Sequence, residues 1–431
     1  MGRRAVRVFV RTRPTPALAS GLSFTESQCV IARSFTCSSL STPSEGTALS
    51  VDGVLHNATQ EEVYATTAAP VVDAVLRGGN GAVIAYGPTG AGKSFTMAGQ
   101  GLSKARTMGL AGGEGAASLK EIVSDNKRGV IPRALRHVFE ELERRGGNNR
   151  EGAVTVSYLE IYNEVMRDLL EPARTQAAVV AAENGNNQDR GAVCVKGLSC
   201  KVVQSETEAL EWFLKGEAAR TTGPHALNTL SSRSHAVFIV SITPQFNGSS
   251  KAQSSQLALV DLAGSERTKK SGSGGLALKE AKFINKSLSF LEQTVAALAA
   301  AARRRKFTGG MSGSDGHEHI PFRQTKLTEV LRGALSGGGQ AAMIACVWPK
   351  DAQVEETLCA LRFAARVRGL QTDGKVRTFS SGGGNLILNV AAAIIITSTS
   401  ISIIILPPPR DRQLARTMIL ICLCVCLHTS R

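Results

Sequence analysis

The chain has 431 residues, of which 43% are hydrophobic, and it carries a formal net charge of +15. This composition supplies enough apolar side chains for a sizeable core, so it excludes a wholly disordered protein. The charge predicts attraction to a polyanion, which can be nucleic acid, an anionic lipid surface or an acidic protein surface.

Buried strands and amphipathic helices alternate along the chain. In chain order, the pattern predicts a strand at Val6–Arg11, a helix at Glu61–Leu76, a strand at Ala82–Tyr86, a helix at Ile131–Arg145, strands at Val154–Tyr162, Ala236–Thr243 and Gln256–Leu262, a helix at Ser287–Ala302 and a strand at Met343–Val347. This alternation is typical of an α/β domain built on a central sheet. The segments Ala98–Arg128, Thr175–Asp189 and Arg303–Gly316 are expected to be long surface loops.

The composition changes near Ser380, after which a glycine-rich segment leads into the apolar run Asn385–Leu406. That run is long enough to span a bilayer. Its β-branched clusters fit an aggregation-prone, atypical C-terminus at least as well, so a membrane partner is not expected, although the tail is apolar over residues 385–427. Nine cysteines without a disulfide framework fit a reducing interior.

A phosphate-binding loop follows the strand that ends at Tyr86. Its residues are Gly87, Pro88, Thr89, Gly90, Ala91, Gly92, Lys93 and Ser94, which fit the pattern G-x-x-x-x-G-K-[ST]. Glycines let successive backbone N–H groups point at phosphate oxygens, a lysine neutralises the β- and γ-phosphates, and the final hydroxyl ligates Mg²⁺. A chance glycine-rich turn is the alternative in a chain with 43 glycines, but the strand before the loop and the helical start after it argue against that alternative.

Two further loops suit the same chemistry. Asp261 ends a buried strand, where phosphate-loop enzymes hold the Mg²⁺ shell, and Gly264 allows the backbone close to a γ-phosphate. The segment Asn228–His235 is dense in hydroxyls that can bind Mg²⁺ or hold an attacking water, and Arg233 can pair with Glu266. Taken alone, such a serine-rich loop is more often a helix cap or a solvated turn.

These motifs together resemble the phosphate loop, switch I and switch II of kinesin motor domains, in the family's order and spacing. Val10–Pro14 resembles the segment that contacts adenine, and residues 319–328 resemble the track-binding loop and helix. The segment from Glu356 to Arg366 is similar to the last helix before the neck linker. Residues 49–56 and 285–293 are most similar to the ninth kinesin subfamily, which implies a cilium or flagellum.

The resemblance implies a P-loop NTPase fold: an α/β domain with a central, mostly parallel twisted sheet flanked by helices on both faces. It covers about residues 5–372 as a motor domain and leaves 373–431 as a divergent tail, which begins with a remnant of a neck linker. The implied activity is microtubule-stimulated hydrolysis of ATP with Mg²⁺ as cofactor. The implied setting is the cytoplasm and its cytoskeleton, and an N-terminal motor implies movement towards the plus end.

The resemblance also assigns roles to residues. The base pocket is implied to contain Arg11, Arg13, Pro14, Tyr86 and Phe95. Lys93 and Ser94 bind phosphate and Mg²⁺, Ser232 completes the Mg²⁺ shell, and Asp261 holds a Mg²⁺-bound water. Ser231 helps to hold the lytic water, Gly264 senses the γ-phosphate, and the pair of Arg233 with Glu266 positions the water for attack.

Basic residues after switch II are expected to face the acidic microtubule surface. They are Lys269, Lys270, Lys279, Lys282, Lys286, Arg323, Lys326 and Arg332. Taken singly, each is more often part of a solvated face. Two other hypotheses remain open at this point: a non-motile, nucleotide-regulated microtubule-binding protein, and a P-loop ATPase acting on nucleic acid, which the motifs do not support. The sequence identifies no dimer partner, because no sustained heptad pattern follows the motor.

Overall fold

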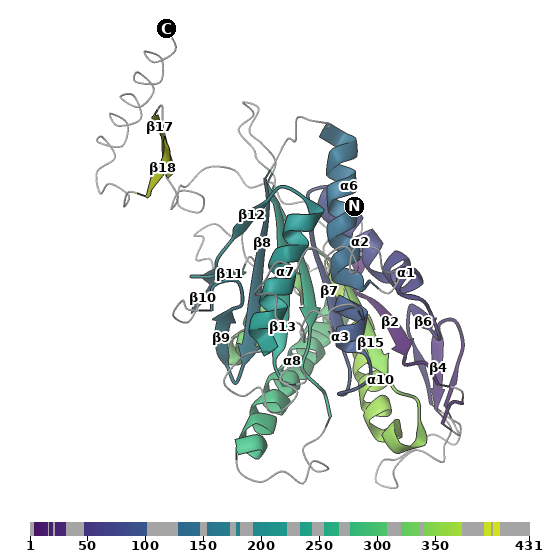
Figure 1. The fold of residues 1–431 in the computed structure, drawn as a ribbon. Coiled ribbons are helices and arrows are strands. Elements are labelled where there is room, and N and C mark those ends of the chain that lie inside the picture. Colours follow the sequence, from purple (N-terminus) through teal and green to yellow (C-terminus); the bar gives the residue numbers. More distant parts are fainter. Residues whose placement is uncertain are drawn as a thin grey trace. The chain divides into compact units, whose positions relative to one another are not determined.

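The computed structural model describes residues 4–15, 17–19, 22–31, 47–100, 128–146, 153–172, 178–181, 193–221, 233–243, 254–266, 276–307, 320–335, 339–372, 392–397 and 400–405. The chain divides into two compact units, one formed by residues 1–247 and 253–378 and the other by residues 248–252 and 379–431. The first unit contains the central sheet (Figure 1), and its residue ranges include all candidate site residues. In the second unit, β17 (Ala392–Thr397) pairs antiparallel with β18 (Ser400–Ile405).

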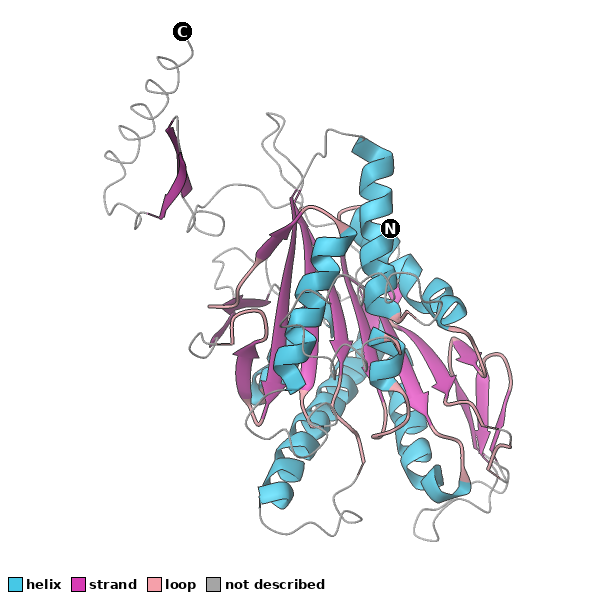
Figure 2. Cartoon of the chain, in the orientation of Figure 1, coloured by secondary structure: helices cyan, strands magenta, loops and turns pink. Residues whose placement is uncertain are grey.

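A nine-stranded sheet forms the centre of the first unit (Figure 2). Its order is β12 (Lys201–Val203), β8 (Ala153–Tyr162), β13 (His235–Thr243), β14 (Ser255–Asp261), β7 (Asn80–Tyr86), β15 (Gly339–Val347), β2 (Arg7–Thr12) and β6 (Gly53–Leu55), and β9 (Val165–Asp168) pairs with β8. The six strands predicted from apolar runs are confirmed as β2, β7, β8, β13, β14 and β15. Their runs are nearly continuous because both faces of these strands are covered.

Strand directions are mixed rather than mostly parallel. The pairings of β14 with β7, β7 with β15, β15 with β2 and β2 with β6 are parallel. Those of β12 with β8, β8 with β13, β13 with β14 and β8 with β9 are antiparallel. The phosphate loop follows β7, in the parallel half of the sheet. In the antiparallel half, β13 begins at the end of the sheet where β7 and β14 finish.

Helices cover both faces of the sheet (Figure 1). One layer consists of α1 (Gln60–Val63), a π-helical segment Tyr64–Ala68, α2 (Ala69–Leu76), α3 (Lys93–Ala98), α6 (Val130–Gly146) and α7 (Glu206–Thr221). The other consists of α8 (Leu276–Phe307), α9 (Lys326–Leu335) and α10 (Val354–Arg368). Alternate residues of β7 join alternate cores: Val83 and Ala85 pack with the first layer, and Ala82 and Ile84 with the second.

Smaller elements lie around this framework. They are β1 (Arg4–Ala5) with β16 (Gln371–Thr372), the sheet of β3 (Leu22–Phe24), β4 (Gln28–Ile31) and β5 (Thr47–Ser50), the hairpin of β10 (Ala178–Ala181) and β11 (Val193–Lys196), and the single turns Phe322–Gln324 and Asp351–Gln353. Most of the three expected surface loops falls outside the described residues. In the described ranges, no helix combines the length and apolar character needed to cross a bilayer.

Topology brings three distant segments to one edge of the sheet. The parallel strands β7 and β14 both end there, with Asp261 opposite Ala85. The neighbouring strand β13 runs the other way and therefore starts there, with Ala236 opposite Asp261. The phosphate loop, the loop after Asp261 and the segment that enters β13 must consequently meet at this edge.

Candidate functional site

The phosphate loop turns tightly between β7 and α3. Gly87 has φ +144°, and a Cβ at this position would lie 2.0 Å from the carbonyl oxygen of Cys346, so only glycine fits. Lys93 is buried, and its Nζ donates hydrogen bonds to the carbonyl oxygens of Gly87 (2.8 Å) and Pro88 (3.0 Å). Burial lowers the pKa of Lys93, and the Asp261 carboxylate opposes that effect. The loop thus holds a single buried cation beneath its own backbone.

Ser94, in the first turn of α3, lies beside Asp261, the last residue of β14. Ser94 Oγ donates to Asp261 Oδ2 over 2.7 Å, and Arg220 Nη1 lies 3.2 Å from the same oxygen. The other oxygen, Asp261 Oδ1, is buried and has no hydrogen-bond partner. A hydroxyl next to a half-satisfied carboxylate is a donor set that suits a hard cation such as Mg²⁺ or a water bound to it.

The described residues contain no cluster of three or more His, Cys, Asp or Glu that could hold a metal by itself. This fits Mg²⁺, which usually takes only one or two protein ligands and completes its shell with water and substrate phosphates. The third expected ligand, Ser232, and the water-holding Ser231 lie outside the described residues.

Glu266 lies against the phosphate loop. Its carboxylate accepts hydrogen bonds from the Thr89 N–H (2.8 Å) and the Thr89 hydroxyl (2.6 Å). Gly264 lies directly beneath this contact, because a Cβ there would be 2.2 Å from Thr89 Oγ1 and 2.3 Å from Glu266 Oε2. The loop after β14 is therefore tied to the phosphate loop. The expected ion pair of Glu266 with Arg233, which precedes β13, stays a prediction.

Arg11 and Phe95 form one wall of the expected base pocket. Arg11 is buried, and its Nη1 donates to Gln60 Oε1 (2.7 Å) and Thr96 Oγ1 (2.8 Å). Its guanidinium lies 5.3 Å from the centre of the Phe95 ring. Phe95 is 40% exposed, so part of its side chain is open to solvent. Gln60 fixes this wall through a second hydrogen bond, from its Nε2 to the carbonyl oxygen of Phe95 (2.6 Å).

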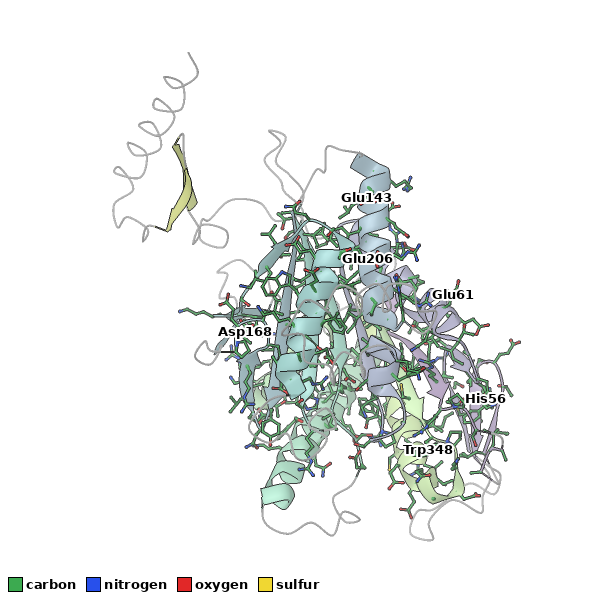
Figure 3. All side chains as sticks on the ribbon, viewed as in Figure 1. His56, Glu61, Glu143, Asp168, Glu206 and Trp348 are labelled. Carbon is green, nitrogen blue, oxygen red and sulfur yellow. The ribbon has the colours of Figure 1, made fainter. Side chains whose placement is uncertain are left out.

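Arg13 connects the N-terminal strand to the phosphate loop. Its Nη1 donates to the carbonyl oxygen of Gly90 (2.8 Å), and its guanidinium stacks 4.0 Å from the ring centre of Trp348. Trp348 directly follows β15 (Figure 3). Arg13 and the neighbouring Pro14 are both exposed, as residues of an open pocket must be.

Tyr86 lies apart from the wall formed by Arg11 and Phe95. It is only 2% exposed, and its ring lies 4.4 Å from that of Phe363 in α10, in the core on the α8–α10 face. Arg11 bonds to α1 and α3, which lie on the opposite face of the sheet. Because side chains alternate along a strand, the last residue of β7 points away from that wall. Burial raises the pKa of Tyr86, and the Glu292 carboxylate adds to the effect.

The described basic candidates lie on the α8–α9 layer. Lys286 on α8 and Arg323 in the turn before α9 are exposed, while Lys326 and Arg332 on α9 are half-buried. Lys326 Nζ lies 3.2 Å from Glu329, and the Arg332 guanidinium lies 5.6 Å from the Phe322 ring centre. Lys269 and Lys270 fall outside the described residues. Lys279 and Lys282 lie in α8, where the backbone alone is described.

Three residues of the site escaped the sequence analysis. Arg220, in α7, is 1% exposed in its side chain and bonds to Asp261 and Ser234. Gln60 begins α1, and the capping box of Thr59 and Glu62 is a signal in the sequence that could have placed that helix start. Trp348 and Arg220 had no such signal, because each acts through contacts between segments that lie far apart in the chain.

Comparison with known proteins agrees with this geometry. The model of the kinesin motor domain matches residues 20–370. The chain is 44% identical over 381 residues to "Kinesin-like protein KLP1" of Chlamydomonas reinhardtii, covering 86% of this chain and 44% of that protein. It is 39% identical over 333 residues to "Kinesin-like protein KIF9" of Homo sapiens, covering 75% and 36%. The chain thus spans less than half the length of these two relatives.

A solved structure is also similar. It is described as "Structure of a fast kinesin: Implications for ATPase mechanism and interactions with microtubules". It matches with a TM-score of 0.67 and 31% identity, over 90% of this chain and 98% of the other. The resemblance drawn from the motifs, including the likeness to the ninth subfamily, is confirmed by these matches.

Proposed function

Because the chain belongs to the kinesin motor domain family, we propose that it is a microtubule motor that hydrolyses Mg·ATP at the phosphate loop. The observation that carries this proposal is the contact between the residue that follows Lys93 and the residue that ends β14, where Ser94 Oγ lies 2.7 Å from Asp261 Oδ2. A hydroxyl, an acidic residue at the end of a neighbouring strand and a buried lysine are the groups that phosphoryl transfer requires of a P-loop enzyme.

The chain's own residues would bind and orient the substrate. Lys93 would exchange its two carbonyl acceptors for phosphate oxygens, which are stronger acceptors because they are charged. Ser94 and Asp261 would hold Mg²⁺, Asp261 through a water, and the unpartnered Asp261 Oδ1 supports that role. The bound cation would neutralise charge that develops on the phosphates.

Positioning of the attacking water would depend on the two switch loops. We assign Ser231 and Arg233 to the loop before β13, with Ser232 as the further Mg²⁺ ligand, and Gly264 and Glu266 to the loop after β14. Closure would require Glu266 to leave Thr89 and pair with Arg233. Glu266 accepts both of these hydrogen bonds from one residue, Thr89. Only that one contact has to break for Glu266 to pair with Arg233, which supports the proposed exchange.

Track binding would use the α8–α9 layer. Its basic residues, among them Lys286 and Arg323, suit the acidic surface of a microtubule. The next helix in the chain after β14 is α8, so release of γ-phosphate at Gly264 would be transmitted to the track-binding helices along this part of the chain. Movement towards the plus end, a motor domain spanning residues 5–372 and action in a cilium or flagellum are parts of the same proposal, supported by the subfamily resemblance.

The test is ATP turnover by the full chain with and without microtubules. We expect microtubules to raise turnover, and the variant Lys93→Ala to lose turnover under both conditions because the phosphates lose their buried cation. Turnover that is unaffected by microtubules would favour the alternative, a non-motile microtubule-binding protein. Undiminished turnover by Lys93→Ala would contradict the assigned site.

A further inference from the structure

One buried histidine connects β13, the loop after β14 and α8, three segments that the proposed mechanism uses. His235 is the first residue of β13 and is 3% exposed. Its Nδ1 accepts a hydrogen bond from the Ala263 N–H (3.1 Å), and its Nε2 lies 2.8 Å from Ser287 Oγ. Ala263 belongs to the loop after β14, and Ser287 is a residue of α8 that is 2% exposed. A single imidazole therefore touches the switch I strand, switch II and the helix that continues from it.

These hydrogen bonds fix the tautomer of the ring. Because Nδ1 accepts from a backbone N–H, it carries no proton, so the ring proton is on Nε2 and is donated to Ser287 Oγ. Burial lowers the pKa of His235 to about 3, and the nearby cations Arg220 and Lys93 add to the effect. The ring is thus neutral at cellular pH, and the bonds run in one direction, from Ala263 through His235 to Ser287.

The backbone end of this chain of bonds is at the γ-phosphate sensor. Ala263 immediately precedes Gly264, which lies beneath the contact of Thr89 with Glu266. A shift of the loop at Gly264 must also move the Ala263 N–H. All three groups are buried, so an N–H that lost its acceptor would find no water to replace it, and the ring is expected to follow the loop.

The other end is on the proposed track-binding layer. Ser287 directly follows the exposed Lys286 on α8. The same helix packs on α9, where Thr294 Oγ1 of α8 lies 3.4 Å from the carbonyl oxygen of Pro321 in the segment before α9. A displacement of the His235 ring would therefore shift α8 and with it the basic residues on that layer.

We propose that His235 is a positioning residue that couples the backbone at Ala263–Gly264 to α8 through Ser287. The coupling rests on the proposed function, since it transmits the state of the nucleotide to microtubule affinity. A merely structural histidine would stabilise the fold equally in every nucleotide state. A coupling histidine contributes to the difference in microtubule affinity between the nucleotide states, and this difference is measurable.

The test compares Ser287→Ala with Ser289→Ala in the full chain. Both remove one hydroxyl from α8, but Ser289 is exposed and makes no contact with His235. For each protein, the microtubule Kd is measured by co-sedimentation with ADP and with a non-hydrolysable ATP analogue. We expect the ratio of the two Kd values to shrink about fivefold in Ser287→Ala, the change that one ordinary hydrogen bond gives, and to stay at the wild-type value in Ser289→Ala.

Two results would overturn the proposal. In the first, both Kd values of Ser287→Ala stay at the wild-type values; in the second, both rise by the same factor, so that the ratio is again that of the wild type and the role of Ser287 is structural. Binding of fluorescent Mg·ADP to each variant verifies its fold. The variant His235→Gln keeps hydrogen-bonding groups at this place, so its ratio of Kd values should lie between those of Ser287→Ala and the wild type. If the wild-type chain itself shows a ratio of one, the proposed motor function fails along with the coupling. A normal wild-type ratio with an unaltered Ser287→Ala refutes the coupling alone.

Discussion

Arg220 illustrates how single buried charges determine the shape of the site. Its side chain is 1% exposed, and its Nη1 lies 3.2 Å from Asp261 and 3.7 Å from Glu217. Burial opposes its charge, but Asp261 and Glu217, together with Tyr158 and Glu160, outweigh that effect and raise the pKa of Arg220. Removing one partner of such a group would leave an uncompensated buried charge, which is strongly destabilising. Arg220 and Ser94 therefore hold the same oxygen of Asp261 in place.

His235 leads to a prediction about pH. Its folded-state pKa is about 3, against an ordinary value of 6.5. Above about pH 6.5 the ring is neutral in both states. As the pH falls from 6.5 towards 3, the unfolded chain takes up a proton that the folded chain refuses, so the free energy of unfolding should fall by up to about 1.4 kcal/mol per pH unit.

Urea unfolding of the wild type and of His235→Gln at pH 7, 6 and 5 measures this slope. Glutamine does not titrate in this range, so its curve should fall less steeply than the wild-type curve. Parallel curves for the two proteins would show that His235 is not the group responsible.

Residue identities could be predicted where a motif requires a particular chemistry. The motifs predict Lys93, Ser94 and Asp261, because phosphate and Mg²⁺ need those groups at those spacings, and the fold brings all three together. Tyr86 lies away from Arg11 and Phe95, because the motif gives only its position in the chain, whereas the pleat of β7 decides which face receives its ring. Arg220 could not be predicted, because its partner lies 41 residues away in the chain.

At the scale of elements, long apolar runs predicted strands well, and helix ends were less accurate. The predicted helix Glu61–Leu76 is interrupted by the π-helical segment Tyr64–Ala68, just before Pro70. Proline has no N–H for the α-helical ladder and clashes with the preceding turn, which accounts for the change of winding. The predicted helix Ser287–Ala302 is the middle of α8, which runs from Leu276 to Phe307. The short strands β3, β4 and β5 have too few residues to show a period.

Helix α9 gives the second prediction. Thr325 and Thr328 cap its start reciprocally, since the Thr325 N–H donates to Thr328 Oγ1 (3.2 Å) and the Thr328 N–H donates to Thr325 Oγ1 (3.3 Å). The N–H of Lys326 donates to Glu164 Oε2 (2.9 Å). Thr325→Ala should therefore lower the free energy of unfolding by about 1 kcal/mol and weaken microtubule binding, because the first turn of α9 would fray.

Denaturant unfolding and microtubule co-sedimentation measure the two effects, and Thr325→Ser, which keeps the hydroxyl, is the matched control. A Thr325→Ala variant that unfolds at the wild-type midpoint would contradict the capping role. An unfolding midpoint that falls while track binding is unchanged would remove the first turn of α9 from the proposed interface.

At the scale of the whole molecule, charge is divided between two faces of one sheet. The α8–α9 layer carries Lys286 and Arg323 as exposed cations. On the opposite layer, α6 carries basic residues that are neutralised locally: Arg144 and Arg145 both bond to Glu141, and Arg136 bonds to Glu140. The net charge of +15 therefore does not indicate which face of the protein attracts an acidic partner. The distribution was invisible in the sequence, because only the fold assigns each helix to a face.

This division predicts that equal charge changes have unequal effects. Arg323→Gln and Arg144→Gln each remove one exposed positive charge, one from the proposed track face and one from the opposite face. Arg323→Gln should weaken microtubule binding by about two- to fivefold at low salt, the range expected for one exposed charge pair. The difference from the wild type should shrink as salt screens the interaction. Arg144→Gln should leave affinity unchanged at every salt concentration, because its charge faces away from the track and is already paired with Glu141.

Co-sedimentation across a series of potassium chloride concentrations measures both variants against the wild type. Equal losses of affinity in the two variants would mean that the microtubule responds to the net charge of the protein, and a loss confined to Arg144→Gln would place the track on α6. A loss confined to Arg323→Gln that disappears at high salt is the outcome that only a directed electrostatic face produces, because net charge alone cannot distinguish two exposed arginines.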